Sequence, residues 1–415
     1  MNNLSNPKRK WTIMVYMVAD TSDSFYQAAM KNITEMTEAK FNDQIKVVVH
    51  ADAPSPWRTK CWEVKGASEV KKGEATGIDC QHSCLLDFVE KCMNSYESDY
   101  YLLVLWGHGQ GIDWKAKVLA DRPAGSEIIG AGKRSAPGSG GALEIGEIGK
   151  ALSDLKLPQR IRKANFVVGF DACLMGMVEI YYQIAPYVGW AVAANDEIPD
   201  TGWPYMQILN KLGEKPHTEP ESLAGAIVVQ CSQFYSKDEF SSEDIVSFSA
   251  TELNEGNCKD LRDRVEELRS QLTEHLKIDS GLKSIREARE FAEDFREKAY
   301  VDLHAFCAAL QRKAELKESE AALRELGRAA RAANQALKAF APKYEFSDAY
   351  PYMYWKDARA VSICFPESPD LEGTLPGQQI DWGSYKELKF SEETGWYTFV
   401  DQFLKVLGDN ASPVR

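Results

Sequence analysis

The chain has 415 residues, of which 44% are hydrophobic and 27% are charged, the proportions of a globular protein. Its 62 Asp and Glu residues outnumber its 49 Lys and Arg residues. The resulting net charge of −13 argues against nucleic acid or an anionic membrane as a partner and fits a peptide substrate that carries basic residues. Since no run of about 20 apolar residues occurs, no segment is expected to span a membrane.

The first half of the chain alternates apolar, β-rich runs with segments of helical periodicity. This alternation predicts a mostly parallel α/β sheet with right-handed crossovers. The apolar runs 102–111 and 166–176 are bounded by glycine and indicate strands buried on both faces. In chain order we expect a strand at 11–20, a helix at 24–40, a strand at 45–52, a hairpin-like piece at 61–64, a helix at 83–96, a strand ending at 108, a helix at 144–155, a strand ending at 173, a helix at 174–188 and a strand at 190–195.

The second half changes character and becomes rich in Ala, Leu, Glu, Arg and Lys. Its periodicity predicts three or four helices over 252–340. The β-rich run 360–366 is expected to return as a late strand of the main sheet, and a helix over 396–407 is expected to close the chain. The predicted division is a catalytic α/β domain over 1–251, a helical region over 252–345, and a C-terminal segment over 346–415 that packs on the catalytic domain.

Two of the expected strand ends carry reactive side chains. One strand stops at His108 between two glycines, and the next stops at Cys173. Catalytic groups of parallel sheets gather at the carboxyl ends of the strands, and a nucleophilic thiol needs a nearby base such as histidine. A helix beginning at 174 would lower the pKa of the thiol through its dipole. The N–H groups of Gly109 and Cys173 are the expected oxyanion hole, so the pattern favours a Cys-His protease.

Acidic residues surround the same strand ends. Asp171 lies two residues before Cys173 and shares its face in an extended strand, so its carboxylate is expected to line a pocket for a basic side chain. A purely structural role, such as a helix cap, is the alternative. Asp196 and Asp200 follow the next strand and add acid to the same rim, while Trp203 fits either a pocket wall or the core.

The cysteines and the N-terminus bear on the compartment. The nine cysteines are odd in number and scattered, which is typical of a reducing cytosol, and residues 1–11 contain no apolar stretch of a secretory signal. We therefore expect a cytoplasmic protein. The spacing of Cys80, His82 and Cys84 is wrong for a zinc site, so no metal site is expected.

Several segments together match one family pattern. They are WTIMVYMVAD (11–20), LVLWGHGQG (103–111), FDACLMGMVE (170–179), the acidic stretch into Gly202-Trp203-Pro204-Tyr205, YVDLHAF (300–306), AVSICFP (360–366) and TGWYTFVDQFL (394–404). On these residues the chain resembles the clostripain-type cysteine peptidases, the C11 family of the caspase-like clan. The resemblance extends over about 11–405, nearly the whole chain.

The resemblance implies a caspase-like fold and an endopeptidase that cleaves after Arg or Lys. His108 and Cys173 match the catalytic pair, and Asp171 matches an acid of the S1 pocket. A second S1 acid would fall at Asp200 or at Asp196. Family members are often zymogens that cut themselves between the histidine and the cysteine, and some depend on calcium. Since no D-x-D-x-D-G loop is present, no cofactor, including Ca²⁺, is expected to be required.

Self-cleavage has an obvious place in the sequence. The loop 111–142 joins the histidine and cysteine strands, and its Gly- and Ser-rich tail is typical of a protease-sensitive segment. Arg134 is the predicted processing site, and Lys133 is the second choice. An ordinary flexible insertion is the alternative.

Two other classes of function were considered. A catalytically silent caspase-like scaffold would use the helical region 252–340 as a surface for a regulatory protein partner, but the His108–Cys173 pair argues against silence. A small-molecule hydrolase or nucleotide-binding protein lacks a supporting motif, because neither a P-loop nor a G-x-G-x-x-G or G-x-S-x-G sequence occurs.

Overall fold

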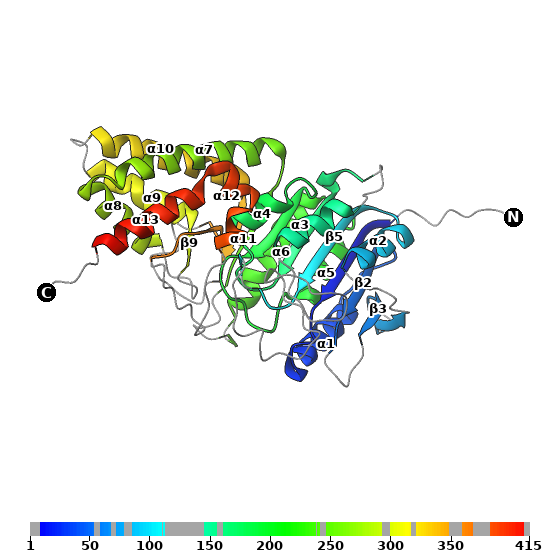
Figure 1. Ribbon diagram of the computed structural model, residues 1–415. Helices are drawn as coiled ribbons and strands as arrows, with labels where there is room; N and C mark the ends of the chain where they lie inside the picture. Colours follow the sequence, from blue (N-terminus) through cyan, green and yellow to red (C-terminus); the bar gives the residue numbers. More distant parts are fainter. Residues whose placement is uncertain are drawn as a thin grey trace.

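The structure, a computed structural model, describes residues 9–53, 59–67, 72–78, 85–109, 111–112, 145–155, 161–237, 239–240, 246–292, 299–316, 321–347, 359–367 and 382–410. Within these residues one mixed sheet is built from nine strands: β1 (Arg9–Met17), β2 (Ile45–Ala51), β3 (Lys60–Lys65), β4 (Glu74–Ile78), β5 (Ser98–Trp106), β6 (Phe166–Asp171), β7 (Trp190–Ala194), β8 (Ser247–Glu252) and β10 (Lys343–Phe346). They lie in the order β10-β8-β7-β6-β5-β1-β2-β3-β4 (Figure 1).

The centre of this sheet is parallel. Strands β7, β6, β5, β1 and β2 are paired in parallel, whereas β8 with β10 and β3 with β4 extend the two edges in antiparallel fashion. The apolar runs 102–106 and 166–170 form the two middle strands because each buries side chains on both faces. The predicted fold class, a mostly parallel α/β sheet flanked by helices with a helical C-terminal region, is confirmed.

Helices cover both faces of the sheet. One face packs against α1 (Asp23–Glu38), α5 (Tyr205–Glu214) and α6 (Pro220–Tyr235), and the other against α2 (Leu85–Ser95), α3 (Ile145–Asp154) and α4 (Val178–Ile184), while a short 3-10 turn, η2 (Lys163–Asn165), precedes β6. Alternate residues of β1 supply the two layers, because Val15 packs in the first and Met14 in the second.

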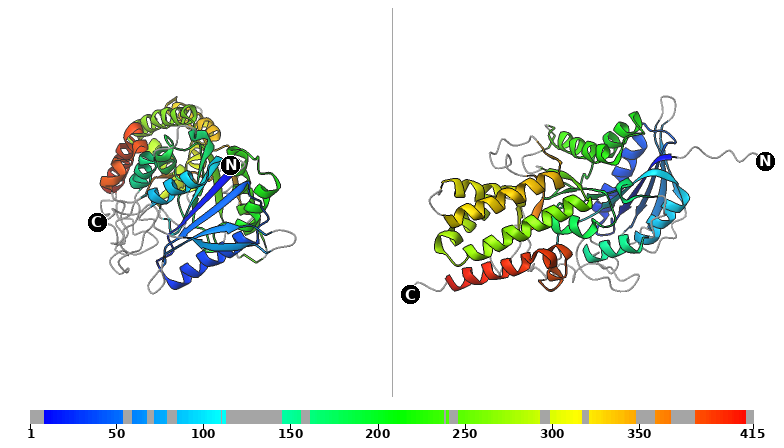
Figure 2. Two further views of the ribbon diagram at one scale, coloured as in Figure 1. Left: turned by 90° about the vertical axis from the view of Figure 1, so that its right-hand side faces the viewer. Right: turned by 90° about the horizontal axis from the view of Figure 1, so that it is seen from above.

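The second half of the chain forms a helical bundle beside the sheet (Figures 1 and 2). Its elements are α7 (Glu255–His275), α8 (Asp279–Ala292), α9 (Leu303–Leu316), α10 (Ala321–Phe340), α11 (Trp382–Lys386), α12 (Lys389–Thr394) and α13 (Trp396–Asn410). Helix α10 packs against both α7 and α9, and α13 packs against α7. The bundle shares one continuous apolar core with the α2–α3–α4 face of the sheet.

The late strand differs from the sequence-based expectation. The run 360–366 provides β11 (Ser362–Cys364), which pairs antiparallel with β9 (Tyr300–Asp302) in a separate two-stranded sheet and not with the main sheet. The strand that does return to the main sheet is β10, which pairs with β8 at the edge. Strand β11 stays close to the main sheet through a bridge between Met177 and Ser362.

Two further features concern membranes and thiols. No helix within the described ranges is long and apolar enough to cross a membrane.

Cys61 in β3 is disulfide-bonded, and its partner lies outside the described residues. The expectation of uniformly reduced cysteines therefore does not hold for Cys61. The described cysteines that are free are Cys92, Cys173, Cys231, Cys258, Cys307 and Cys364.

Candidate active site at the ends of β5 and β6

The sheet brings the predicted histidine and cysteine segments into contact. In the register of β5 and β6, Trp106 lies opposite Asp171, and the Gly107 N–H donates to the Asp171 carbonyl at 3.2 Å. His108 and Cys173 therefore follow directly after paired strand ends. Gly109 packs on the backbone of Cys173 so closely that a Cβ atom there would collide with the Cys173 carbonyl oxygen. The predicted juxtaposition of the two segments is present.

The start of α1 orients the His108 ring. The imidazole is half-buried and stacks on the Phe25 ring, with 4.0 Å between the centroids and 7° between the planes. Its Nε2 lies 3.5 Å from Thr21 Oγ1. Ser22 caps the helix by accepting from the Phe25 N–H at 3.1 Å, which fixes Phe25 in the first turn. Thr21 and Phe25 were missed by the sequence analysis, because their contact with His108 spans more than 80 positions.

The Cys173 thiol is held by the backbone of Ile198. Its Sγ accepts from the Ile198 N–H at 3.3 Å and lies 3.6 Å from the Ile198 carbonyl, to which the S–H donates. Burial raises the pKa of the thiol to about 12, although the Ile198 N–H lowers it. The nearby carboxylates of Glu197, Asp196 and Asp200 raise the thiol pKa further.

The expected lowering of this thiol pKa by a helix beginning at 174 is therefore wrong. Helix α4 begins at Val178, and its N-cap is Met177. The intervening residues cross the end of β7: the Leu174 N–H donates to the Asp196 carbonyl at 3.0 Å, and Leu174 has a φ of +61°. A residue in this left-handed conformation cannot continue a right-handed helix, so no helix dipole starts at the thiol.

Asp171 is a buried carboxylate with one free oxygen. It is 2% exposed, and its Oδ2 accepts from the Trp203 N–H at 3.0 Å and from the Tyr205 hydroxyl at 2.8 Å. Its Oδ1 is buried and has no hydrogen-bond partner in the described part of the chain. Burial raises the pKa of Asp171 to about 7, the two hydrogen bonds lower it, and the charge of Glu35 raises it. The site holds an acid with unused hydrogen-bonding capacity.

The other predicted acids lie differently. Asp196 is buried, and its Oδ1 accepts from the N–H of Glu197 at 2.8 Å, which closes its own turn. Asp200 is exposed. Both act on the Cys173 thiol through their charge. The acid that acts on Asp171 is Glu35 of α1, which the sequence analysis missed.

Glu35 belongs to an acidic hollow beside this site. The hollow has a volume of about 610 Å³. Its lining residues come from α1, from α5 and the turn before it, and from the end of α6 and the turn after it: Lys31, Thr34, Glu35, Glu38, Thr201, Met206, Gln207, Phe234, Glu239 and Phe240. Burial raises the pKa of Glu35 to about 7, while the charge of Lys31 lowers it. Asn32, one turn earlier, connects the hollow to the strand ends, because it accepts from Trp106 Nε1 at 2.9 Å and donates to the Thr201 carbonyl at 2.9 Å.

Trp203 belongs to the core, which decides between the two expectations for it. Its side chain is 1% exposed and packs on Gly169 and edge-on against Phe248. Its contribution to the site is the backbone N–H that binds Asp171. The preceding Gly202 has a φ of +69°, and a Cβ atom there would lie 2.9 Å from Asp171 Oδ2, so glycine lets this turn reach the carboxylate.

Some predicted residues fall outside the described ranges. These are the processing residues Lys133 and Arg134, and Cys80, His82 and Cys84 of the rejected zinc pattern. Among the residues that the structure does describe, no group of three or more His, Cys, Asp or Glu side chains is arranged to hold a metal ion.

Comparison with known proteins identifies the family. The peptidase C11 model, described as the clostripain family, matches residues 15–403. This chain belongs to the clostripain family. The predicted family is confirmed, and it is a family of cysteine peptidases.

The similarity to individual clostripain-family members is more distant. Clostripain of Hathewaya histolytica is 28% identical over 133 residues, which cover 31% of this chain and only 23% of clostripain. A secreted C11 cysteine protease from Bacteroides thetaiotaomicron, solved with an irreversible peptide inhibitor, has a TM-score of 0.61 at 17% identity, and the match covers 94% of this chain and 99% of that one. An inactive zymogen C11 protease from Parabacteroides distasonis has a TM-score of 0.60 at 16% identity, with the same coverages. These structures share the fold.

Proposed function

We propose that this clostripain-family chain is a cysteine endopeptidase that cleaves after Arg, with Lys second. The observation that carries the proposal is the contact between the Gly109 and Cys173 backbones at paired strand ends, with His108 between the two glycines. Next to them lies Asp171, whose buried Oδ1 is without a hydrogen-bond partner among the described residues. A guanidinium from a P1 arginine would supply that partner, because it donates two parallel N–H bonds to a carboxylate.

The proposed chemistry uses these groups in sequence. The Cys173 thiol transfers its proton to His108, and the thiolate attacks the scissile carbonyl carbon. The Gly109 and Cys173 N–H groups donate to the oxyanion of the tetrahedral intermediate. His108, now an imidazolium, protonates the leaving amine, and a water molecule then hydrolyses the thioester. Asp171 holds the P1 cation, and Asp196 and Asp200 add negative charge at the rim.

The arrangement of the thiol supports a resting form that needs activation. Cys173 is hydrogen-bonded to both backbone groups of Ile198, and its pKa is raised to about 12. We therefore propose self-processing in the loop between His108 and Cys173, at Arg134 or at Lys133. Mass spectrometry of the wild type against Cys173→Ala tests this. Fragments of roughly 15 and 31 kDa, at about 110 Da per residue, should appear only when Cys173 is present. An intact wild-type chain with full activity would contradict it.

The remaining expectations stay proposals. No cofactor is required, Ca²⁺ included, and the partners are proteins or peptides with basic residues. The domain division at 251 and 345 is also kept, although β10 spans residue 345 and pairs with β8 of the catalytic region. A cytoplasmic location is also kept as a proposal, and the disulfide at Cys61 is an observation against it, because disulfides persist in oxidising compartments.

Purified protein tested on fluorogenic peptides ending in Arg, Lys or Asp, with and without Ca²⁺, decides between the peptidase and a silent scaffold. We expect Arg to be cleaved fastest, Lys second and Asp not at all. Cys173→Ala and His108→Ala should each remove nearly all activity without unfolding, since acid–base help alone is worth about 10²–10⁴-fold. Near-normal turnover by a folded Cys173→Ala protein would overturn the proposal.

A further inference from the structure

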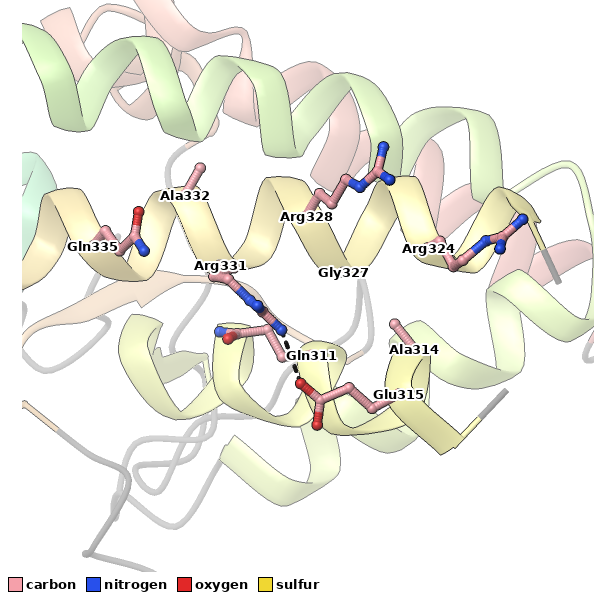
Figure 3. A pocket seen from close by; sticks show the side chains of 9 residues that line it. All are labelled: Gln311, Ala314, Glu315, Arg324, Gly327, Arg328, Arg331, Ala332 and Gln335. Carbon is pink, nitrogen blue, oxygen red and sulfur yellow. Dashed lines mark hydrogen bonds and ion pairs between the residues drawn. The ribbon is translucent and has the colours of Figure 1, made fainter. Parts of the chain in front are cut away.

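The helical bundle carries a groove that the proposed peptidase chemistry does not use. It lies between α9 and α10 and has a volume of about 440 Å³ (Figure 3). Small residues form part of its lining, namely Ala314, Gly327 and Ala332. The two helices touch here, because a Cβ atom at Gly327 would collide with the Ala314 side chain. The small residues let the two helices approach closely at the floor of the groove.

Three arginines are among the residues that line this groove, although Figure 3 shows the guanidinium of Arg328 pointing away from α9. Arg324, Arg328 and Arg331 follow one another at spacings of four and three residues, which places them on one face of α10. Figure 3 shows Arg331 reaching across the groove to Glu315 of α9, with 2.9 Å between the charged atoms. Arg328 pairs with Glu325 of its own helix at 2.7 Å. For Arg324, no ion pair occurs within the part of the chain that the structure describes.

The charge balance of the groove is opposite to that of the whole chain. Among the described residues, its lining carries three arginines against one acid, Glu315, in a protein of net charge −13. The existing ion pairs are exposed, with Arg328 at 74% and Arg331 at 59% side-chain exposure. Exposed ion pairs of this kind contribute little to the stability of the fold. Carboxylates of a partner can therefore replace Glu315 and Glu325 with little loss of stability.

We propose that this groove docks an extended, Asp- and Glu-rich peptide segment of a partner protein. Arginine binds carboxylates bidentately, and the three arginines of the lining follow one another along α10. Nucleic acid fits less well. Among the described residues, the lining contains no aromatic side chain on which a base could stack. The groove thereby gives the helical region a function separate from peptide cleavage.

Fluorescence anisotropy of a fluorescein-labelled octaglutamate peptide, titrated with full-length Cys173→Ala protein, tests the proposal without interference from cleavage. We expect saturable binding that weakens as salt is added. The double substitution Arg324→Ala/Arg328→Ala should raise Kd at least tenfold. Ala332→Glu, which adds an acid to the groove and leaves the arginines in place, should also weaken binding. The control is Arg264→Ala on α7, an exposed arginine outside the groove, which should leave Kd unchanged.

Three results would overturn the proposal. They are an unchanged Kd in both groove variants, equal weakening by Arg264→Ala, and equal or tighter binding of a labelled octalysine or oligouridylate probe. Circular dichroism of each variant shows whether the fold is kept, so that a loss of binding is assigned to the groove.

Discussion

Gly109 and Cys173 lie so close that a Cβ atom at position 109 would come within 2.9 Å of the Cys173 nitrogen and would collide with its carbonyl oxygen. This contact fixes the distance between the turn that carries His108 and the turn that carries the thiol. It also places the two N–H groups proposed for the oxyanion hole on neighbouring segments. Replacing Gly109 by alanine therefore tests whether this contact positions the two turns.

Gly109→Ala is expected to lower kcat by about 10²-fold, because the methyl group must push the histidine turn away from Cys173 and small displacements of reacting groups cost that much. Steady-state kinetics on an Arg-ended fluorogenic peptide measures this, and KM should change less than kcat. Gly77→Ala is the matched control, since nothing lies within 4 Å of a Cβ atom there. Unchanged kcat in Gly109→Ala would show that the two turns are not tightly coupled.

The activity on arginine substrates should depend on the ionisation of Asp171. Its pKa is raised to about 7, so the carboxyl is neutral below that pH and negative above it. Only the negative form attracts a guanidinium, and kcat/KM for an Arg substrate should therefore rise between about pH 6 and 8. The profile of Asp171→Asn should lack this rise and have a lower plateau. If the same rise persists in Asp171→Asn, another group, such as His108, is responsible for it.

Asp171→Asn should also stabilise the fold at alkaline pH. The carboxyl pKa is about 7 in the folded chain and 3.8 when unperturbed, so the folded state binds the proton more tightly and loses stability as pH rises from about 4 to 7. Removing the buried charge should raise the free energy of unfolding at pH 8 by on the order of 1–3 kcal/mol, and by less at pH 5. Urea unfolding at both pH values measures the difference, with the exposed Asp200→Asn as the control. Equal effects at both pH values would show that the pKa of Asp171 is not raised in the folded chain.

Those parts of the site whose position follows from the local sequence of a single strand or helix could be predicted. The apolar runs before His108 and Cys173 have only one reasonable interpretation, as buried parallel strands, and their carboxyl ends must then lie on the same edge of the sheet. Periodicity likewise located α1 and α2 to within about two residues, and α13 to within about three.

What the sequence did not predict depends on contacts between distant segments. Asp171 gains its partners from Trp203 and Tyr205, 32 and 34 positions away, and nothing local marks them as such. Residues 174–177 resemble a helix start, but the N–H groups of Leu174 and Gly176 donate to the carbonyls of Asp196 and Ala194, at and just after the end of β7. The short run 362–364 suits any sheet edge, and only the packing of the bundle gives it β9 as a partner.

The acids around Cys173 should control how readily its thiol ionises. Burial is the largest cause of the raised pKa, and Glu197, Asp196 and Asp200 raise it further because they repel a forming thiolate. The double substitution Glu197→Gln/Asp200→Asn removes two of these charges and leaves Asp196, which closes its own turn, in place. Each unit by which the thiol pKa falls raises the thiolate fraction tenfold, and it lowers the nucleophilicity of the thiolate by a smaller factor. Alkylation of Cys173 by iodoacetamide at pH 8 should therefore become several-fold faster.

Mass spectrometry of the peptide that contains Cys173 follows this rate. The buried thiol of Cys231 in the same molecule reports any general loosening of the fold. Glu214→Gln/Glu221→Gln, at two exposed glutamates on α5 and α6, is the control of equal charge change. If Cys173 reacts faster and Cys231 does not, the rim acids hold the thiol in its protonated form. The same acids are proposed to attract a P1 arginine, whose positive charge would offset their repulsion of the thiolate. A rate that does not change in Glu197→Gln/Asp200→Asn would leave burial and the Ile198 hydrogen bonds as the cause of the resting state, and activation would then require this turn to move.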